Sequence, residues 1–289
     1  MHDFKLFNAF FQGKALKFLH RIIDLALEED GMDLTSNAIF PEDNTARAII
    51  VTRQECVIAG LPVIDLVMQR LAGPSTVNCL VKEGALIPGL TRIAELKGQT
   101  RKILKAERVI LNLVARMSGI ATLTRSFSEL LKNSGVTILD TRKTSPGMRY
   151  PEKYAVQAGG GTNHRLNLEE MLMIKDNHID QCGSISVAVD KLRRTYSPCP
   201  GIEVECRNVS QVREAVRAGV QRIMLDNMQE DEMSTALDLI PENIESEISG
   251  RVHLHNINSL ARLKPTFISS GAITHSAVPV DLSMKIEAQ

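Results

Sequence analysis

Six short apolar runs in the chain are each followed at once by residues that can bind ions or phosphate. The following residues are cations, carboxylates and two Ser-Gly pairs. Together they have the chemistry to hold an anionic, phosphate-bearing substrate with a metal ion. In chain order, the runs and their followers are Val136–Leu139 with Asp140–Lys143, Met171–Ile174 with Lys175–Asn177, Ile202–Val204 with Glu205, Ile223–Leu225 with Asp226-Asn227, Glu245–Ile248 with Ser249-Gly250, and Phe267–Ser269 with Ser270-Gly271.

The most cationic of these segments contains Arg142 and Lys143. The planar guanidinium of Arg matches a carboxylate or a phosphate, and Lys supplies a compact charge. A solvated basic turn is the alternative interpretation. Downstream, Gly159–Gly161 permits close approach of the backbone to a ligand, and His164 and Arg165 add two donors. The cluster favours an anion site.

Carboxylates end two successive runs, at Glu205 and Asp226. Because carboxylates repel a phosphate, their expected uses are to hold Mg²⁺, to bind sugar hydroxyls or to stabilise a developing cation. Alternatively, they balance the charge of Lys175 or Arg142, and both roles are compatible. Lys175 itself either meets such a partner or extends to solvent. Glu203 lies on the same strand face as Glu205, and the pattern does not separate their roles.

The two late Ser-Gly pairs, Ser249-Gly250 and Ser270-Gly271, offer backbone N–H groups and hydroxyls where a helix is expected to begin. Late strands of a barrel commonly hold phosphate in this way, although one such pair alone is a common turn. His253 and His255 have the spacing of a metal pair on a strand. Surface histidines before a helix are the favoured interpretation.

These residues require parallel strands to bring them together. The six runs begin about 20 to 35 residues apart with helix-like segments between them, which is the spacing of βαβ units. The carboxyl ends of parallel strands meet at one edge, where barrel enzymes carry their sites. The sequence therefore predicts a parallel α/β barrel, with six strands placed and one or two still to be found.

The part before residue 101 has a mixed α and β pattern. Lys14–Asp30 and Pro62–Ala72 have helical spacing, and Ala46–Thr52 has the pattern of a strand. Two further helices are predicted over Lys102–Met117 and Thr122–Asn133. The last segment, residues 280–286, is expected to return to this first domain.

Composition limits the possible partners. The 289 residues have a formal net charge of zero, 44% apolar residues and no Trp, so nucleic-acid and membrane-surface binding are not expected. No apolar run is long enough to span a bilayer. Five cysteines without zinc-site spacing indicate reduced thiols, and a cytoplasmic protein is expected.

Several long motifs resemble the quinolinate phosphoribosyltransferase family, also called carboxylating nicotinate-nucleotide pyrophosphorylases. The likeness covers nearly the whole chain. The matching segments are Asp33-Leu34-Thr35, Glu107-Arg108 with Asn112, Ser118–Ala121, Asp140–Thr144 with Pro146-Gly147, Glu152–Val156, Gly159–Gly161 with Asn163–Arg165, Ile174–His178, Glu203–Glu205, Leu225–Asn227, and Gly271-Ala272 with Thr274–Ser276.

The resemblance implies two domains. Residues 1–117 would form an N-terminal α/β sandwich, with residues from about 276 to 289 packed back on it. Residues 118–275 would form an incomplete, seven-stranded TIM-like α/β barrel that carries the site. It also implies a homodimer or a dimer-based hexamer, in which Arg108 reaches the neighbouring subunit's site.

The implied reaction joins quinolinate and phosphoribosyl pyrophosphate, with Mg²⁺, and yields nicotinate mononucleotide, pyrophosphate and CO₂. Lys143, Lys175, Glu205 and Asp226 would be catalytic, and Glu205 and Asp226 would also hold the metal, directly or indirectly. The implied substrate-binding residues are Arg108, Thr141, Arg142, His164, Arg165, Ser249, Gly250, Ser270, Gly271 and His275.

The chain departs from the family's Glu-Ala-Ser-Gly-Gly pattern, because Ile248 and Arg251 replace two small residues. Arg251 is expected either to obstruct a phosphate-facing amide or to add charge to that phosphate. Rival interpretations are a pyrophosphorylase for nicotinate or another ring acid, a relative linked to molybdate transport, and an anion-binding regulator. The arginine clamp argues for quinolinate, and the carboxylates argue against a simple anion binder.

Overall fold

The computed structural model describes residues 4–71 and 73–287 and divides the chain into two compact units. The first unit comprises Met1–Arg125, Thr144–Gly160 and Ile273–Gln289. The second comprises Ser126–Lys143 and Gly161–Ala272. The division predicted from sequence fell after residue 117 and assigned residues 144–160 to the barrel, whereas the contacts group that segment with the first unit.

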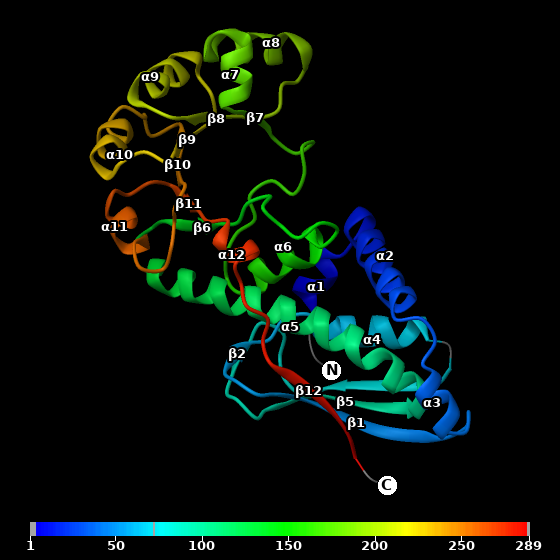
Figure 1. The fold of residues 1–289 in the computed structure, drawn as a ribbon. Helices are drawn as coiled ribbons and strands as arrows, with labels where there is room; N and C mark the ends of the chain where they lie inside the picture. The colour runs from blue at the N-terminus through cyan, green and yellow to red at the C-terminus, as the bar shows by residue number, and fades with distance from the viewer. Residues whose placement is uncertain (1–3, 72, 288–289) are drawn as a thin grey trace. The chain divides into compact units, whose positions relative to one another are not determined.

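The first unit contains a four-stranded antiparallel sheet in the order β12-β1-β5-β3 (Figure 1). The predicted return of the C-terminal segment is confirmed, because β12 pairs with β1 along its whole length. The strands are β1 (Thr45–Thr52), β3 (Ser75–Cys79), β5 (Arg92–Gln99) and β12 (Leu282–Glu287), and a small separate pair is formed by β2 (Cys56–Val57) and β4 (Leu86–Ile87).

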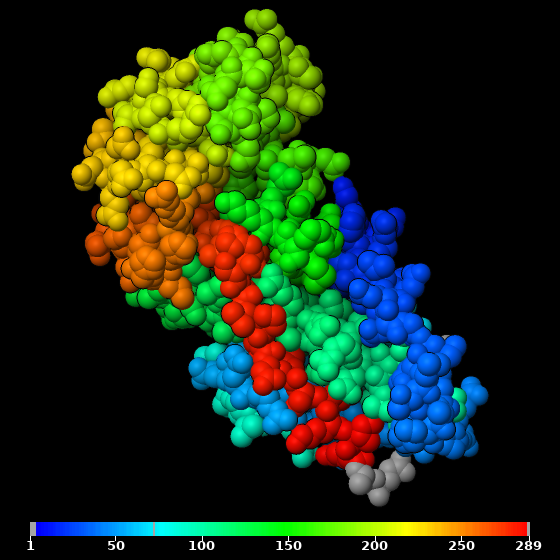
Figure 2. Space-filling model, in the orientation of Figure 1, coloured from blue at the N-terminus to red at the C-terminus, as the bar shows by residue number. Residues whose placement is uncertain are grey.

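Helix α5 (Thr100–Leu131) is continuous, so the prediction of two helices in this region is wrong. Gly119 lies inside this helix. A glycine is needed there because a Cβ would collide with the carbonyl oxygen of Val278. Close approach, not a chain break, explains this glycine. The amide of Val280 donates to the carbonyl of Ala115 (3.0 Å), and Figure 2 shows the C-terminal segment, in red, lying along the surface beside this helix.

The remaining helices of the first unit are mostly short. Asp33 caps α3 by accepting a hydrogen bond from the amide of Ser36 (2.9 Å). The bounds are α1 (Lys5–Phe10), α2 (Gly13–Glu29), α3 (Leu34–Ile39), α4 (Leu61–Arg70), α6 (Arg149–Ala158) and α12 (Ala272–His275), of which α12 begins one residue before this unit does.

The second unit contains a parallel six-stranded sheet in the order β6-β11-β10-β9-β8-β7, which confirms the α/β prediction (Figure 1). Seven strands were expected. Within the described residues, a lone parallel bridge between Leu139 and Thr162 continues the pairing beyond β6. The strands are β6 (Thr137–Leu139), β7 (Leu172–Ile174), β8 (Ile202–Cys206), β9 (Arg222–Asp226), β10 (Glu245–Ser249) and β11 (Phe267–Ser269).

Helices connect these strands and cover the outside of the sheet. They are α7 (Asp176–Cys182), α8 (Ile185–Thr195), α9 (Val209–Ala218), α10 (Glu230–Leu237) and α11 (Ile257–Arg262). Val204, Leu225 and Ile248 are fully buried on the central strands, as expected for a sheet covered by helices. No helix among residues 4–71 and 73–287 is long and apolar enough to cross a membrane. All five cysteines are free, as predicted.

Candidate active site

A cavity of about 380 Å³ opens at the carboxyl ends of the second unit's strands. It brings together most of the predicted site residues. Those that line it are Thr141, Arg142, Lys143, His164, Arg165, Lys175, Glu205, Asp226 and Ser249. The parallel register explains the convergence, because Asp226 at the end of β9 lies opposite Ser249 at the end of β10.

One carboxylate of the cavity is already paired with a cation. The Nζ of Lys175 lies 2.5 Å from the Oε2 of Glu205. Lys175 follows β7 and Glu205 lies on β8, so neighbouring strands present the pair. The predicted balancing of carboxylate by lysine is therefore present, and it leaves Glu205 inside the cavity where a ligand can compete for it.

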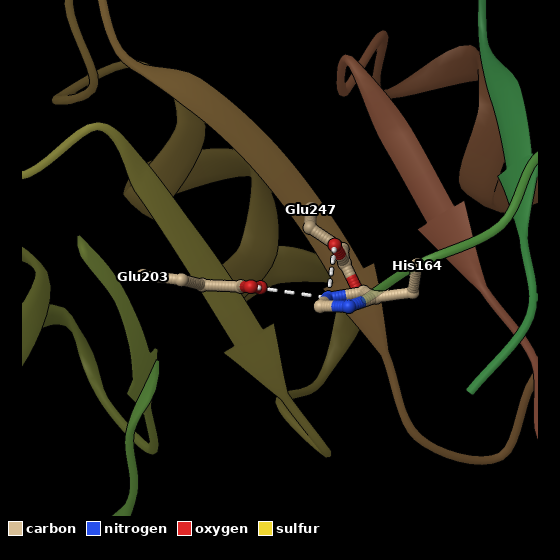
Figure 3. A group of neighbouring side chains, drawn as sticks. All are labelled: His164, Glu203 and Glu247. Atoms are coloured by element: carbon tan, nitrogen blue, oxygen red, sulfur yellow. Dashed lines mark ion pairs between the residues drawn. The ribbon is translucent and has the colours of Figure 1, made fainter. Parts of the chain in front are cut away.

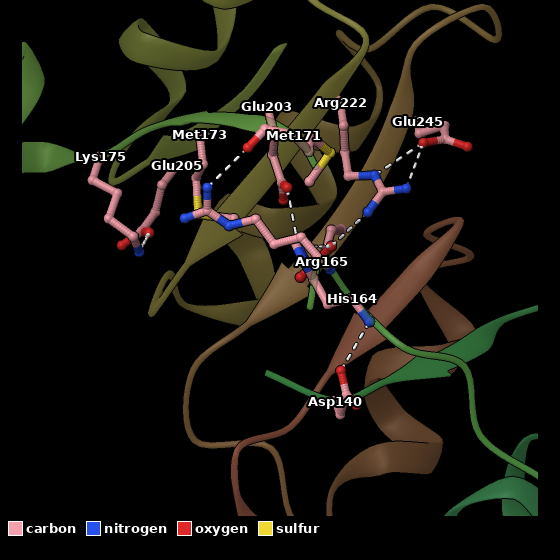
Figure 4. Close-up of polar contacts among 11 residues, drawn as sticks. Asp140, His164, Arg165, Met171, Met173, Lys175, Glu203, Glu205, Arg222 and Glu245 are labelled. Carbon is pink, nitrogen blue, oxygen red and sulfur yellow. Dashed lines mark hydrogen bonds and ion pairs between the residues drawn. The ribbon is translucent and has the colours of Figure 1, made fainter. Parts of the chain in front are cut away.

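Asp140 organises the loop that carries His164 and Arg165, although its side chain was not predicted as a site residue. It is fully buried at the end of β6. Its Oδ1 accepts the amide of His164 (2.8 Å) and its Oδ2 accepts the Nδ2 of Asn163 (2.7 Å), as Figure 4 shows for His164. Two bonds from one carboxylate fix the direction in which this loop enters the cavity.

Arg165 lies across the wall of the cavity, held by the chain near β7 (Figure 4). Its Nη1 donates to the carbonyl of Met171 (2.9 Å), and its Nη2 lies 3.5 Å from the sulfur of Met173. Burial, and next the neighbouring Arg142, lower the pKa of Arg165. A guanidinium remains charged despite such a shift, so two adjacent cations line this wall of the cavity.

Beneath this wall lies a buried floor, formed by His164, Glu203, Glu247 and Arg222. The Nε2 of His164 lies 3.0 Å from Glu203 Oε2 and 3.5 Å from Glu247 Oε2 (Figure 3). The Nδ1 of His164 accepts the amide of Arg165 (2.7 Å). In the neutral imidazole the proton is therefore on Nε2, directed at the two glutamates.

Burial raises the pKa of both floor glutamates. Glu203 and Glu247 are fully buried, and desolvation is the largest cause of a rise in pKa from 4.5 to about 7 in each. Their mutual repulsion raises the pKa of Glu247 further, while Arg222, 3.5 Å from Glu247, opposes the rise. Both carboxyls therefore take up a proton at higher pH than a solvent-exposed glutamate does.

The floor also has the donor set of a metal site, since ligand atoms of His164, Glu203 and Glu247 lie within 4.8 Å of one another. Arg222 already supplies positive charge there. It stacks 4.3 Å above the ring of Phe267 and pairs with Glu245 (2.7 Å), which is visible in Figure 4. A fixed cation at this distance disfavours a metal ion in the floor.

The turn after β10 has a strict glycine requirement. Gly250 has φ +93, and a Cβ there would collide with the side chain of Asn227 and lie 2.9 Å from its backbone nitrogen. Arg251 also has positive φ (+51), but its side chain is exposed, and it is not among the cavity-lining residues. Ile248, the other departure from the family pattern, is buried in the core.

The remaining predicted residues have other surroundings. The hydroxyl of Ser270 is buried and donates to the carbonyl of Val252 (3.0 Å), and Gly271 follows it at the end of β11. Arg108 and His275 belong to the first unit. Arg108 is exposed on α5, and the Nδ1 of His275 lies 2.7 Å from the hydroxyl of Ser276.

Besides Asp140, the predicted site residues left out Asn227, Glu247 and Arg222. Asn227 and Glu247 line the cavity, and Arg222 supports Glu247. A signal existed for Glu247, because it precedes Ser249 by two residues and therefore lies on the same strand face. Arg222 begins its strand, where only the three-dimensional register reveals its partner.

Comparison with known proteins identifies the family. Residues 33–118 match the N-terminal domain of quinolinate phosphoribosyl transferase, and residues 120–285 match its C-terminal domain. A probable carboxylating nicotinate-nucleotide pyrophosphorylase of Bacillus subtilis is 42% identical over 261 residues, 90% of each chain. A decarboxylating quinolinate phosphoribosyltransferase of Nicotiana tabacum is 35% identical, covering 94% of this chain and 83% of its own.

Solved structures agree. The nicotinate-nucleotide pyrophosphorylase of Francisella tularensis superposes with a TM-score of 0.89 at 33% identity, covering 96% of this chain and 99% of its own. The matches to both domains, the two sequence relatives and this structure agree on one assignment. The chain belongs to the quinolinate phosphoribosyltransferase family.

Proposed function

We propose that the protein transfers the phosphoribosyl group of phosphoribosyl pyrophosphate to quinolinate, with loss of CO₂, and yields nicotinate mononucleotide and pyrophosphate for NAD biosynthesis. The observation that carries this proposal is the cavity that brings a basic wall together with the carboxylates of Glu205 and Asp226. A dicarboxylate and a pyrophosphate ester need the wall, and a sugar that becomes cationic needs the carboxylates.

The two quinolinate carboxylates would be held by the wall. Arg142 and Arg165 offer planar forks, and Thr141 offers a hydroxyl beside them. Both ring nitrogens of His164 already face protein partners, so we assign it to orienting Arg165 next to the substrate. Lys143 would complete the anion site at the junction of the two substrates.

Bond formation would occur between the pyridine nitrogen and the anomeric carbon. As that C–N bond forms and the C–O bond to pyrophosphate breaks, positive charge develops on the ribose. Glu205 and Asp226 are placed at neighbouring strand ends to stabilise this charge. Lys175 can exchange its contact with Glu205 for the departing phosphate.

The cavity's donor set suits Mg²⁺, which prefers one or two carboxylates together with substrate phosphates. Glu205 and Asp226 would hold the ion. When bound, it supplies charge neutralisation for the pyrophosphate leaving group. Glu205 and Asp226 determine where the ion's positive charge would lie, because both are at the ends of central strands.

Decarboxylation would follow the transfer. The electron pair of the breaking bond between the ring and the 2-carboxylate stays on ring carbon 2, where the adjacent cationic nitrogen stabilises it, and a proton from solvent then replaces CO₂. The wall arginines must release the 2-carboxylate while still holding the 3-carboxylate. Two separate loops supply the two forks, which permits this, and Arg165 has its own anchor at the carbonyl of Met171.

We further propose that Ser249-Gly250 and Ser270-Gly271, with His275, hold phosphate, and that Arg108 completes the site of a partner subunit in a homodimer or dimer-based hexamer. The exposed position of Arg108 supports this assignment. A cytoplasmic location is in keeping with five free thiols.

The test is turnover of purified protein with quinolinate, phosphoribosyl pyrophosphate and Mg²⁺, followed through mononucleotide formation and CO₂ release. Nicotinate serves as the competing substrate, because it lacks the 2-carboxylate. We expect turnover with quinolinate and at least about a hundredfold lower kcat/KM with nicotinate, since a paired carboxylate is lost. Absence of turnover with quinolinate would refute the proposal.

A further inference from the structure

Asn227 is a polar member of the cavity that the reaction outlined above does not use. It follows Asp226 directly and has a left-handed backbone with φ +55. Its Nδ2 donates to Asp226 Oδ2 over 2.9 Å. One oxygen of the Asp226 carboxylate is therefore held by the protein, and the other is directed by that contact.

The same residue is tied to the turn after β10. The backbone amide of Asn227 donates to the carbonyl of Ser249 (3.0 Å). Its side chain packs so closely on Gly250 that no Cβ could be accommodated there. Asn227 thus contacts both the carboxylate that faces the ribose and the turn that faces phosphate.

We infer that Asn227 is a positioning residue that sets the orientation of the Asp226 carboxylate relative to the Ser249-Gly250 turn, for binding of phosphoribosyl pyrophosphate. The inference rests on the proposed function. Because Asn227 would act through Asp226, its loss should affect one substrate only. Phosphoribosyl pyrophosphate should bind more weakly without the amide, whereas quinolinate, held by Arg142 and Arg165, should bind as before.

A simpler role is available for Asn227, because asparagine tolerates left-handed backbone better than other non-glycine residues. Asn227→Gly separates the two roles: glycine accepts the left-handed backbone conformation without strain, and the substitution removes the side chain that contacts Asp226 and Gly250. Lys264→Gly is a matched control, since Lys264 is another exposed residue of the second unit with positive φ (+58).

The measurement is calorimetric affinity for each substrate, with kcat and KM determined in parallel. For Asn227→Gly we expect Kd and KM for phosphoribosyl pyrophosphate to rise about tenfold, the loss typical of one hydrogen bond to a charged group. Kd for quinolinate should stay within about twofold of the unmodified protein, and Lys264→Gly should leave both affinities unchanged. Thermal unfolding of the two variants should be similar.

A double-mutant cycle tests the route through Asp226. In an Asp226→Ala background, Asn227→Gly should cause no further loss of affinity for phosphoribosyl pyrophosphate, because the group it orients is gone. Additive losses would overturn the inference, and so would unchanged affinity in the single variant. Absence of turnover in the unmodified protein would instead refute the proposed reaction, and the affinity comparison would still decide the role of Asn227.

Discussion

Two pairs of carboxylates occupy one barrel and differ in nearly every physical respect. Glu203 and Glu247 in the floor are fully buried beside His164, with a pKa raised to about 7. Glu205 and Asp226 at the rim line the cavity and meet Lys175 and Asn227 respectively. Glu203 and Glu205 are only two residues apart on β8.

The difference shows that the role of a carboxylate in this barrel depends on how deep it lies along its strand, and not on whether it is Asp or Glu. Burial raises the pKa of both floor glutamates, and their contacts with His164 make them a support for that ring and for Arg165. The rim pair is less buried, and Lys175 lies against Glu205. Substitutions in the floor should therefore change stability first, and substitutions at the rim should change catalysis first.

The largest expected effect is at the rim. Asp226→Ala should lower kcat by at least about a hundredfold, since it removes one group that stabilises developing charge. The free energy of unfolding should change by less than about 0.5 kcal/mol, because the residue is partly exposed. Steady-state kinetics and denaturant titration provide both numbers. A large loss of stability with intact kcat would reverse the comparison.

In the floor, Glu247→Ala should destabilise the protein by about 2–4 kcal/mol, because it leaves a cavity and removes one of the two carboxylates beside the half-buried Arg222. Glu247→Gln is the matched control, since it preserves volume, and it should cost much less near neutral pH. Chemical denaturation measures the difference. Equal losses in the two variants would show that the carboxyl chemistry, not packing, holds the floor.

The dependence of stability on pH separates the pairs further. Folding raises the pKa of Glu247 from 4.5 to about 7, so its contribution is complete below pH 4.5 and is lost as pH rises through 7. Relative to Glu247→Gln, the unmodified protein should therefore lose stability between pH 5 and 8, measured by urea unfolding. Parallel curves would contradict the buried-pair assignment.

At the rim, backbone geometry also matters. Gly250→Ala should cost about 1–2 kcal/mol of stability, because φ +93 disfavours a Cβ and the added carbon meets Asn227. Affinity for phosphoribosyl pyrophosphate should fall with it. Thermal unfolding and calorimetry are the measurements. Gly219→Ala, at φ +65 directly after α9, is the control for backbone strain, because a Cβ there would meet only Arg193 Nη2, at an ordinary 3.8 Å.

The smallest effect concerns the departure from the family pattern. Arg251→Gly should stabilise the protein by about 0.5–1 kcal/mol, because glycine accepts φ +51 without strain. KM for phosphoribosyl pyrophosphate should change less than about twofold, since the exposed side chain is not among those lining the cavity. A larger shift in KM would restore the expectation that Arg251 interacts with phosphate.

The strands, and the position of the rim residues at their ends, could be predicted because both leave local signals. Apolar runs marked β6 to β11, and the residue after each run identified Lys175, Glu205 and Asp226. The floor and the Asn227 contact could not be predicted in the same way. They depend on which strands become neighbours and on the loop that Asp140 folds over them, and no local pattern encodes such long-range contacts.

Helix α5 and residues 144–160 illustrate the same limit. Ser118-Gly119 looked like the end of a helix. The glycine is instead required because the backbone of Val278, about 160 residues later in the chain, passes too close to leave room for a Cβ. Gly159 is similar, since a Cβ there would collide with the backbone of Ala121. In both cases the reason for the glycine is a distant segment.

The three-part composition of the first unit has a consequence for synthesis. The ribosome completes the second unit at Ala272, while β12, the edge partner of β1, is still to be made. Until then β1 exposes an unpaired row of backbone groups, which is a template for association with other chains. The nascent protein should therefore be most vulnerable to aggregation late in translation, and release of its final residues should end that interval.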